Sequence, residues 1–208
     1  MGALVPLMKD FEQRPEVDDR ELVAAIRAGE ADGFETLVRR KTPKVYGICY
    51  RVLGNQEDAK DVAQLAFVRI WENLEKYDAS WAFDTWMYRI VTNVAIDWLR
   101  TRQSRDSAVN SSLRLVRTSQ DAEQGVSLQN KEIERVFEDV SSVLSPKQKT
   151  IFVMREMEDL SSAEISRVLG CRESTVRNHL FNARKLMQQE LRRRYPEYAK
   201  LWETRSTS

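Results

Sequence analysis

The side chains best suited to chemistry lie close together near the C-terminal end of the chain, in residues 170–184, GCRESTVRNHLFNAR. Arginine and asparagine form paired hydrogen bonds with base edges, and arginine also holds phosphate groups. The chain has one histidine and two distant cysteines, which leave no ordinary zinc site and no catalytic cluster around a histidine. The pattern predicts recognition without catalysis, and neither a metal nor another cofactor is expected.

The helix in this stretch begins unusually. Gly170 suits a left-handed turn, and the next helix is predicted to start after Arg172, where Ser, Thr, Asp or Asn is usual. Arginine cannot accept a bond from the free N–H groups, and a cation is unfavourable at the positive end of the helix dipole. A DNA phosphate there would meet both the dipole and Arg172. The alternative is that Arg172 points into solvent while Glu173 offsets the dipole.

At about 100° per residue, the helix after Arg172 has one apolar face. Its inward positions are Val176, Leu180, Ala183 and Met187. The candidate DNA-reading residues of this stretch are Arg172, Ser174, Thr175, Arg177, Asn178, Phe181, Arg184 and Lys185. Phe181 points outward, where it needs either a thymine methyl or sugar face or a neighbouring helix.

Helix boundaries upstream place this stretch in a known layout. Ser145-Pro146 is typical of a helix start, and Ser161 with Glu164 three residues later forms a capping box. The short helix that starts there ends at Gly170. Helix, glycine-containing turn and helix together predict a helix-turn-helix.

The first half of the chain also has helical spacing of its apolar residues. We predict two helices within residues 19–53, with a kink or break at Pro43, and a third in residues 55–77 with Asn55 as its cap. A fourth runs from about Phe83 to Arg102. Four more helices follow residue 130, and strand spacing is absent, so the predicted fold is all-α.

Residues 103–130 are rich in Ser, Asn and Gln and hold no period, which indicates a flexible linker. We expect an N-terminal extension (1–19), a helical domain (20–105), the linker (106–130) and a second small helical domain (131–208) that contains the helix-turn-helix. Residues 34–105 and 144–208 carry net positive charge, and the rest carries net negative charge. This alternation suits two modules that face a nucleic acid.

The third helix exposes apolar residues on the face opposite its predicted core. Asp61, Gln64, Leu65 and Val68 lie there together. An apolar pair beside a carboxylate and an amide usually marks a protein contact. The alternative for Leu65 and Val68 is packing against the chain's own N-terminal helices.

Two separated parts of the chain resemble one family. EDAKDVAQLAFVRIWENLEKY and FDTWMYRIVTNVAIDWLRTRQSR resemble domain two of bacterial RNA polymerase sigma factors of the extracytoplasmic-function (ECF) type, and LSPKQKTIFVMREMEDLSSAEISRVLGCRESTVRNHLFNARKLM resembles their domain four. The resemblance implies that Asp61, Gln64, Leu65 and Val68 dock on the clamp coiled coil of the largest polymerase subunit. Leu65 departs from the acidic residue common there. Domain four would contact the flap of the second largest subunit and read the minus-35 element.

The resemblance also implies a minus-10 site in residues 71–105, which hold four of the five tryptophans and several arginines. Aromatic and cationic side chains suit single-stranded DNA. The candidates are Trp81, Asn93, Asp97 and Arg100, which would melt the minus-10 element and capture an unstacked base. Trp71 and Trp86 have helical spacing that favours the core instead. Promoter DNA, both double-stranded and melted, core polymerase and an anti-sigma factor are the implied partners.

The strongest rival is a LuxR-type DNA-binding regulator, because STVRNHLFNARKLM fits that pattern nearly as well. The first half, however, has no phosphoacceptor or ligand-sensing sheet. An enzyme of nucleic-acid metabolism would need a catalytic cluster, and an interaction-only helical protein is the last alternative. The sequence has no signal-peptide pattern and no span, so we expect a cytoplasmic protein without membrane insertion. Both cysteines fit small buried residues in a reducing compartment.

Overall fold

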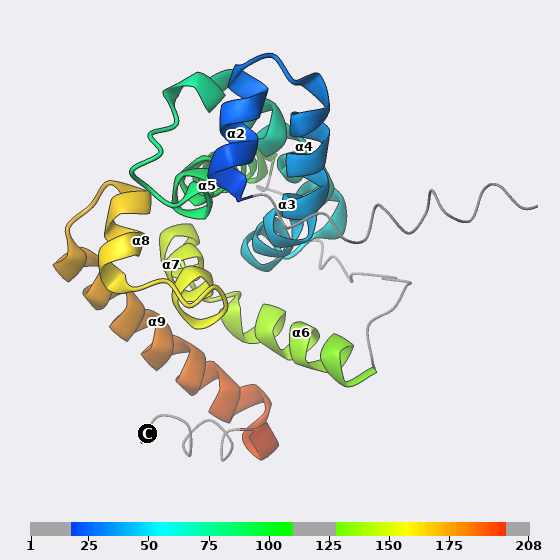
Figure 1. Ribbon diagram of the computed structural model, residues 1–208. Helices are drawn as coiled ribbons and strands as arrows, with labels where there is room; N and C mark the ends of the chain where they lie inside the picture. The colour runs from blue at the N-terminus through cyan, green and yellow to red at the C-terminus, as the bar shows by residue number, and fades with distance from the viewer. Residues whose placement is uncertain (1–17, 110–127, 199–208) are drawn as a thin grey trace, which may run out of the picture.

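The computed structural model describes residues 18–109 and 128–198 of the chain, and the regular elements in these ranges are all helices (Figure 1). The all-α prediction is confirmed. The helices form two bundles, one before and one after residues 110–127. Residues 1–17, most of the expected N-terminal extension (1–19), and residues 199–208 lie outside the described residues.

The first bundle consists of α2 (Asp19–Arg27), α3 (Ala31–Leu53), α4 (Gln56–Asn73), the short 3-10 helix η1 (Leu74–Lys76) and α5 (Phe83–Val109). Gly54 ends α3 in a left-handed conformation with φ of 66°. Asn55 then caps α4, since its side chain accepts a bond from the backbone N–H of Asp58 at 2.9 Å. The predicted cap is confirmed, and the buried face of α4 consists of Ala59, Val62, Ala63, Ala66 and Ile70.

Sequence predicted a kink or break at Pro43, and the break is wrong, because Pro43 lies inside the continuous 23-residue helix α3. Proline removes one N–H donor from the ladder and crowds the preceding turn. The helix buries Leu37 before Pro43 and Val45 and Ile48 after it, with exposures of 1%, 0% and 0%. Burial on both sides of the proline stabilises the helix more than one missing bond destabilises it.

The second bundle consists of α6 (Leu128–Ser141), α7 (Pro146–Glu156), α8 (Ser162–Leu169) and α9 (Glu173–Arg194). Ser161 and Glu164 form the predicted capping box at α8. A second box is formed by Ser145 and Gln148 at α7, where sequence analysis expected only the Ser-Pro start. Gly170 ends α8 with φ of 59°, as a helix-turn-helix requires.

The helices extend into both ends of the stretch predicted as a linker. Helix α5 continues past Arg102 to Val109, and α6 begins at Leu128. Residues 110–127, the remainder of the predicted linker, lie outside the described residues.

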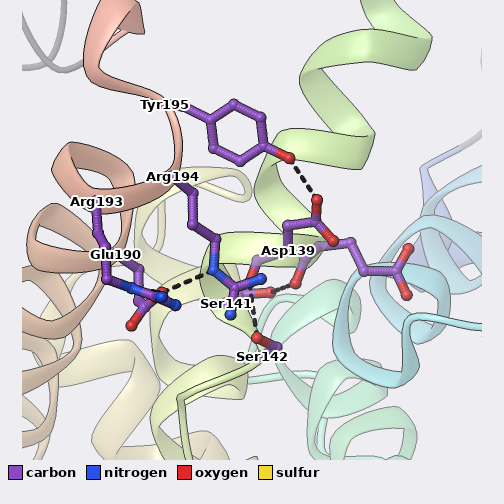
Figure 2. Close-up of polar contacts among 8 residues, drawn as sticks. Asp139, Ser141, Ser142, Glu190, Arg193, Arg194 and Tyr195 are labelled. Atoms are coloured by element: carbon purple, nitrogen blue, oxygen red, sulfur yellow. Dashed lines mark hydrogen bonds and ion pairs between the residues drawn. The ribbon is translucent and has the colours of Figure 1, made fainter. Parts of the chain in front are cut away.

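The C-terminal end of α9 is fastened to α6 by polar contacts (Figure 2). The hydroxyl of Tyr195 donates to Asp139 on α6. Glu190 accepts from Arg193 at 2.6 Å and from Arg194 at 2.8 Å within α9. The bond from Tyr195 to Asp139 is the one of these that joins the C-terminal end of α9 to α6. Helix α9 also packs against α7 and α8.

The two bundles pack against each other, which the sequence did not predict. Helices α3 and α5 of the first bundle contact α7, and α5 also contacts α8. Tyr88 and Ala95 of α5 are 3% and 0% exposed, as are Met87 and Val91 at 0% each. Helix α5 therefore buries side chains around more of its circumference than a helix of one small bundle. The described residues share one continuous core.

Candidate nucleic-acid interface

The outer face of α9 carries most of the candidate DNA-reading residues predicted from the sequence. Val176, Leu180, Ala183 and Met187 are buried as predicted. Of the candidates, those with exposed side chains are Arg172, Ser174, Arg177, Asn178, Phe181, Arg184 and Lys185. Thr175 is half-buried. The helix thus presents a polar, cationic surface along its outer side.

Arg172 occupies the N-cap of α9, and no side chain accepts a cap bond there. The preceding helix α8 has a complete capping box, so the two helices of the helix-turn-helix differ in how their N-termini are capped. The backbone N–H of Thr175 already donates to the carbonyl of Arg172 at 2.9 Å. The N–H groups that precede it at the start of α9 have no intrahelical partner and lie beside a cation. An anion at this position would accept bonds from them and face Arg172 at the same time.

Phe181 is 68% exposed on this face. The alternative of a neighbouring helix over Phe181 is not found among residues 18–109 and 128–198. Its aromatic ring is therefore available for an external partner such as a thymine methyl group.

The cations on α9 differ in how they are held. Arg184 donates to Glu156 of α7 through Nε at 3.0 Å and Nη2 at 2.5 Å. Arg177 pairs with Glu173 on its own helix at 3.2 Å, in a surface pair that contributes little stability. Arg172 and Lys185 have no ion-pair partner in the described part of the chain. Arg184 therefore has a structural role as well as any external contact.

In the first bundle, Trp81 lies in the loop between η1 and α5 and is 40% exposed. The hydroxyl of Tyr77 donates to the carbonyl of Trp81 at 2.7 Å. Arg27 holds the start of the same loop by donating to the carbonyls of Leu74 and Tyr77, both at 2.6 Å. The backbone at Trp81 is thereby fixed while part of its ring remains free.

A groove of about 800 Å³ opens beside Trp81. Its lining brings together aromatic, cationic and amide side chains. They include Trp81, Trp86, Arg89 and Asn93, together with Asp97 and Arg69. The predicted minus-10 residues Trp81, Asn93 and Asp97 thus share one surface, whereas Arg100 is exposed near them and pairs with Asp97 at 3.5 Å.

The core assignment of Trp86 is confirmed in part, since its side chain is half-buried. Its ring centroid lies 5.4 Å from that of Tyr77 and 5.6 Å from that of Phe83. The core assignment of Trp71 is wrong, because its side chain is 53% exposed. The ring of Phe34 packs against it in a T-shaped arrangement, with a centroid distance of 4.7 Å. Trp71 follows Val68 by three residues, so it extends the exposed face of α4 instead.

The outer face of α4 combines apolar and acidic side chains. Leu65 and Val68 are 39% and 51% exposed, and Asp61 and Gln64 are exposed beside them. The alternative from sequence, packing of Leu65 and Val68 under the N-terminal helices, is therefore not observed among the helices that the structure describes. With Trp71, the helix presents a continuous apolar stripe flanked by polar groups, which is typical of a protein contact.

Other chemistry is limited in the part of the chain that the structure describes. No cluster of three His, Cys, Asp or Glu side chains there is placed to hold a metal ion. Burial raises the pKa of the Cys49 thiol to about 12, which removes its nucleophilic form at neutral pH. None of the helices in the described ranges is both long and apolar enough to cross a membrane.

Comparison with known families decides between the candidate interpretations. The family model for sigma-70 region 2 matches residues 37–105, and that for sigma-70 region 4 matches residues 135–187. The ECF RNA polymerase sigma factor SigW of Bacillus subtilis is 30% identical over 180 residues, which cover 83% of this chain and 96% of the relative. The chain belongs to the ECF sigma factors.

Further relatives agree with this assignment. The RNA polymerase sigma-H factor of Pseudomonas aeruginosa is 31% identical over 188 residues, covering 83% of this chain and 93% of the relative. Among solved structures, CnrH in complex with the cytosolic domain of CnrY has a TM-score of 0.63 at 21% identity, covering 85% of this chain and 98% of that chain. The sigma factor RpoE of Bartonella quintana, in complex with the anti-sigma factor NepR, has a TM-score of 0.62 at 16% identity. The match covers 76% of this chain and 96% of that chain.

Membership in the ECF sigma factors means that the chain acts in promoter-specific transcription initiation. A LuxR-type regulator is not favoured, because the chain matches both sigma-70 region 2 and sigma-70 region 4, in the expected order. Sigma factors are initiation factors rather than enzymes. The exposed faces of α9 and α4 and the groove at Trp81 are the surfaces available for this activity.

Proposed function

We propose that α9 reads the minus-35 element of the promoter from the major groove. Arg177 and Asn178 contact base edges, with Ser174 and Thr175 beside them, and Phe181 lies against a thymine methyl group. Arg172 and Lys185 hold phosphates, and Arg184 adds a contact from the edge of the face. The exposure of Phe181 and the uncapped start of α9 support this assignment.

Trp81, Asn93, Asp97 and Arg100 serve the minus-10 element in this proposal. Trp81 takes an unstacked base on its ring, because every base offers a flat surface for stacking. Asn93 and Asp97 contact bases, and Arg100 contacts the backbone. The combination of aromatic and cationic side chains around one groove supports a single-stranded ligand.

The observation that carries the proposal is the exposed stripe of α4, because a helix-turn-helix alone fits many regulators. Asp61, Gln64, Leu65 and Val68 dock on the clamp coiled coil of the largest polymerase subunit. Domain four contacts the flap of the second largest subunit. An apolar stripe of this kind, which the described residues leave uncovered, is typical of a surface that binds another protein.

The division of labour follows the two bundles. Residues 20–105 dock on polymerase and melt DNA, residues 131–208 read the minus-35 element, and residues 106–130 connect them. The chain works in the cytoplasm, and the bond-making chemistry belongs to the polymerase. An anti-sigma factor regulates it, in line with the anti-sigma complexes of CnrH and RpoE.

In vitro transcription from a genomic library tests the proposed function. Core polymerase is supplied with and without this chain, and transcript starts are mapped. We expect a small set of starts that depend on the chain and share two upstream elements. Starts that do not change when the chain is added would contradict the proposal.

A further inference from the structure

Helix α2 contributes an arginine to the loop that carries Trp81. Nη2 of Arg27 donates to the carbonyls of Leu74 and Tyr77, both at 2.6 Å, and Nε donates to Leu74 at 3.2 Å. The guanidinium also lies 5.9 Å from the centroid of the Tyr77 ring. Leu74 and Tyr77 stand where the chain leaves η1 and enters the loop. One side chain of α2 therefore fixes the point from which the loop starts, and the planar fork of arginine suits two acceptors at once.

The same set of bonds continues to Trp81 itself. Tyr77 is 3% exposed, and its hydroxyl donates to the carbonyl of Trp81 at 2.7 Å. The backbone N–H of Trp81 donates to the carbonyl of Asp78 at 3.1 Å. Burial raises the pKa of Tyr77, so its hydroxyl remains a donor, although the guanidinium of Arg20 beside it acts in the opposite direction. Bonds thus run from Arg27 through Tyr77 to the backbone of Trp81.

These bonds hold the loop without using the ring of Trp81. The ring is 40% exposed and forms part of the groove lining, whereas Arg27 is not among the lining residues. A loop that is already fixed loses less conformational freedom when it binds, so a base stacks more tightly on a fixed tryptophan than on a mobile one. The bonds from Arg27 to the carbonyls of Leu74 and Tyr77 lie within the first bundle, so they do not depend on the helix-turn-helix.

We propose that Arg27 is a positioning residue for promoter melting, which holds the loop so that Trp81 captures the unstacked base. The inference rests on the minus-10 role proposed for Trp81. Arg27 contacts no base and acts through Tyr77 and the loop. Helix α2 lies before residues 37–105, which match sigma-70 region 2, so the parts of the chain that act in melting extend beyond that region.

Hydrogen exchange of the full-length chain tests whether Arg27 holds the loop. In Arg27→Ala, the amides of residues 78–82 should exchange about tenfold faster than in the parent, because the start of the loop is released. The matched control is Arg102→Ala, which breaks an ion pair with Asp58 at the opposite end of α4. Its side chain is 31% exposed, close to the 29% of Arg27, and its loss should leave the loop amides unchanged. Equal loop exchange in Arg27→Ala and the parent would overturn the proposal.

Promoter melting with core polymerase tests whether Arg27 acts through Trp81. Arg27→Ala, Trp81→Ala and the double variant are compared by permanganate reactivity at a start that depends on the chain. Arg27→Ala should melt the promoter about tenfold more slowly than the parent. The double variant should melt it no more slowly than Trp81→Ala alone, because both changes remove the same capture. Losses that multiply would give Arg27 a structural role only and overturn the proposal.

Arg27→Lys separates the charge of Arg27 from its fork of donors. Lysine keeps the charge but is a single point donor, so it should hold one carbonyl less firmly than arginine holds two, and melting should slow about threefold. Melting by Arg27→Lys as slow as by Arg27→Ala would still assign the effect to the fork, whereas parental melting by Arg27→Ala would overturn the proposal. If the parent chain itself directs no start-site selection, the proposed function fails, and the exchange experiment still decides whether Arg27 fixes the loop.

Discussion

Two helices of this sigma factor leave large apolar side chains uncovered, and their surroundings are opposite in charge. On α9, the exposed Phe181 lies among Arg177, Asn178 and Lys185. On α4, the exposed Leu65 and Val68 lie beside Asp61 and Gln64. The cationic set suits a polyanion, and the acidic set suits a protein with basic groups.

This difference shows that an exposed apolar residue alone does not indicate what it binds. The charge of the side chains around it distinguishes a nucleic acid from a protein partner. Binding through α9 should depend steeply on salt, because phosphate contacts release counterions. Binding through α4 should depend on apolar burial and a few directional bonds, and so respond less to salt. Each of the following predictions separates these two surfaces.

The largest effect is expected on α4. The Asp61→Ala/Gln64→Ala chain should stay folded and bind core polymerase about 30-fold less tightly or worse, because two polar contacts at a protein interface are lost together. Co-purification with core enzyme and the melting curve of the variant measure the two properties. Glu57→Ala/Lys60→Ala, an exposed pair earlier on the same helix, is the control and should bind normally. Unchanged co-purification of a folded Asp61→Ala/Gln64→Ala chain would remove α4 from the docking surface.

The next effect concerns base reading on α9. Arg177→Ala should cost about 1 to 3 kcal/mol in holoenzyme binding and relax preference at one position of the minus-35 element. Its pair with Glu173 is on the surface, so the variant should keep its stability. Selection of bound sequences from a randomised element measures the preference. A uniform loss across all sequences would make Arg177 a phosphate contact instead.

The two helix starts of the helix-turn-helix should respond in opposite ways. Ser161→Ala removes the capping box of α8 and should destabilise the domain by about 1 kcal/mol. Arg172→Ser supplies a cap for α9 and should stabilise the free chain by up to about 1 kcal/mol while weakening promoter binding. Urea unfolding and holoenzyme binding measure these changes. An Arg172→Ser chain that is more stable and binds equally well would show that no phosphate lies at this helix start.

The smallest effect separates phosphate contacts from the α4 surface by salt. Arg172→Ala and Lys185→Ala should each flatten the log–log salt dependence of promoter binding by roughly one unit, and weaken all sequences alike. The α4 variant should leave that slope unchanged in whatever holoenzyme it forms. Titrations at several salt concentrations give the slopes. Equal slopes in all chains would place Arg172 and Lys185 away from the phosphates.

Local features of the fold were predictable because their causes lie within a few residues. Asn55, Ser161 and Gly170 act through bonds or backbone angles one to three positions away, and the inward face of α9 follows from helical period. The hydrogen bond from Tyr88 to Glu158 joins residues that are 70 positions apart in the sequence, and no local sequence pattern predicts it. Trp71 has core-like spacing but is 53% exposed, because it contacts Phe34 of α3 at the rim of the bundle instead of entering the core. The local cost of a proline within a helix predicts a kink or break at Pro43, but burial of apolar side chains on both sides of it offsets that cost.

Footprinting on one promoter fragment tests the central claim that α9 and α4 act together. The fragment is probed at one fixed salt concentration with the chain alone, core polymerase alone, and both. Because docking through α4 must hold the two domains at the promoter spacing, protection of the minus-35 and minus-10 elements should appear only with both proteins. Strong, selective protection of either element by the chain alone would contradict the account.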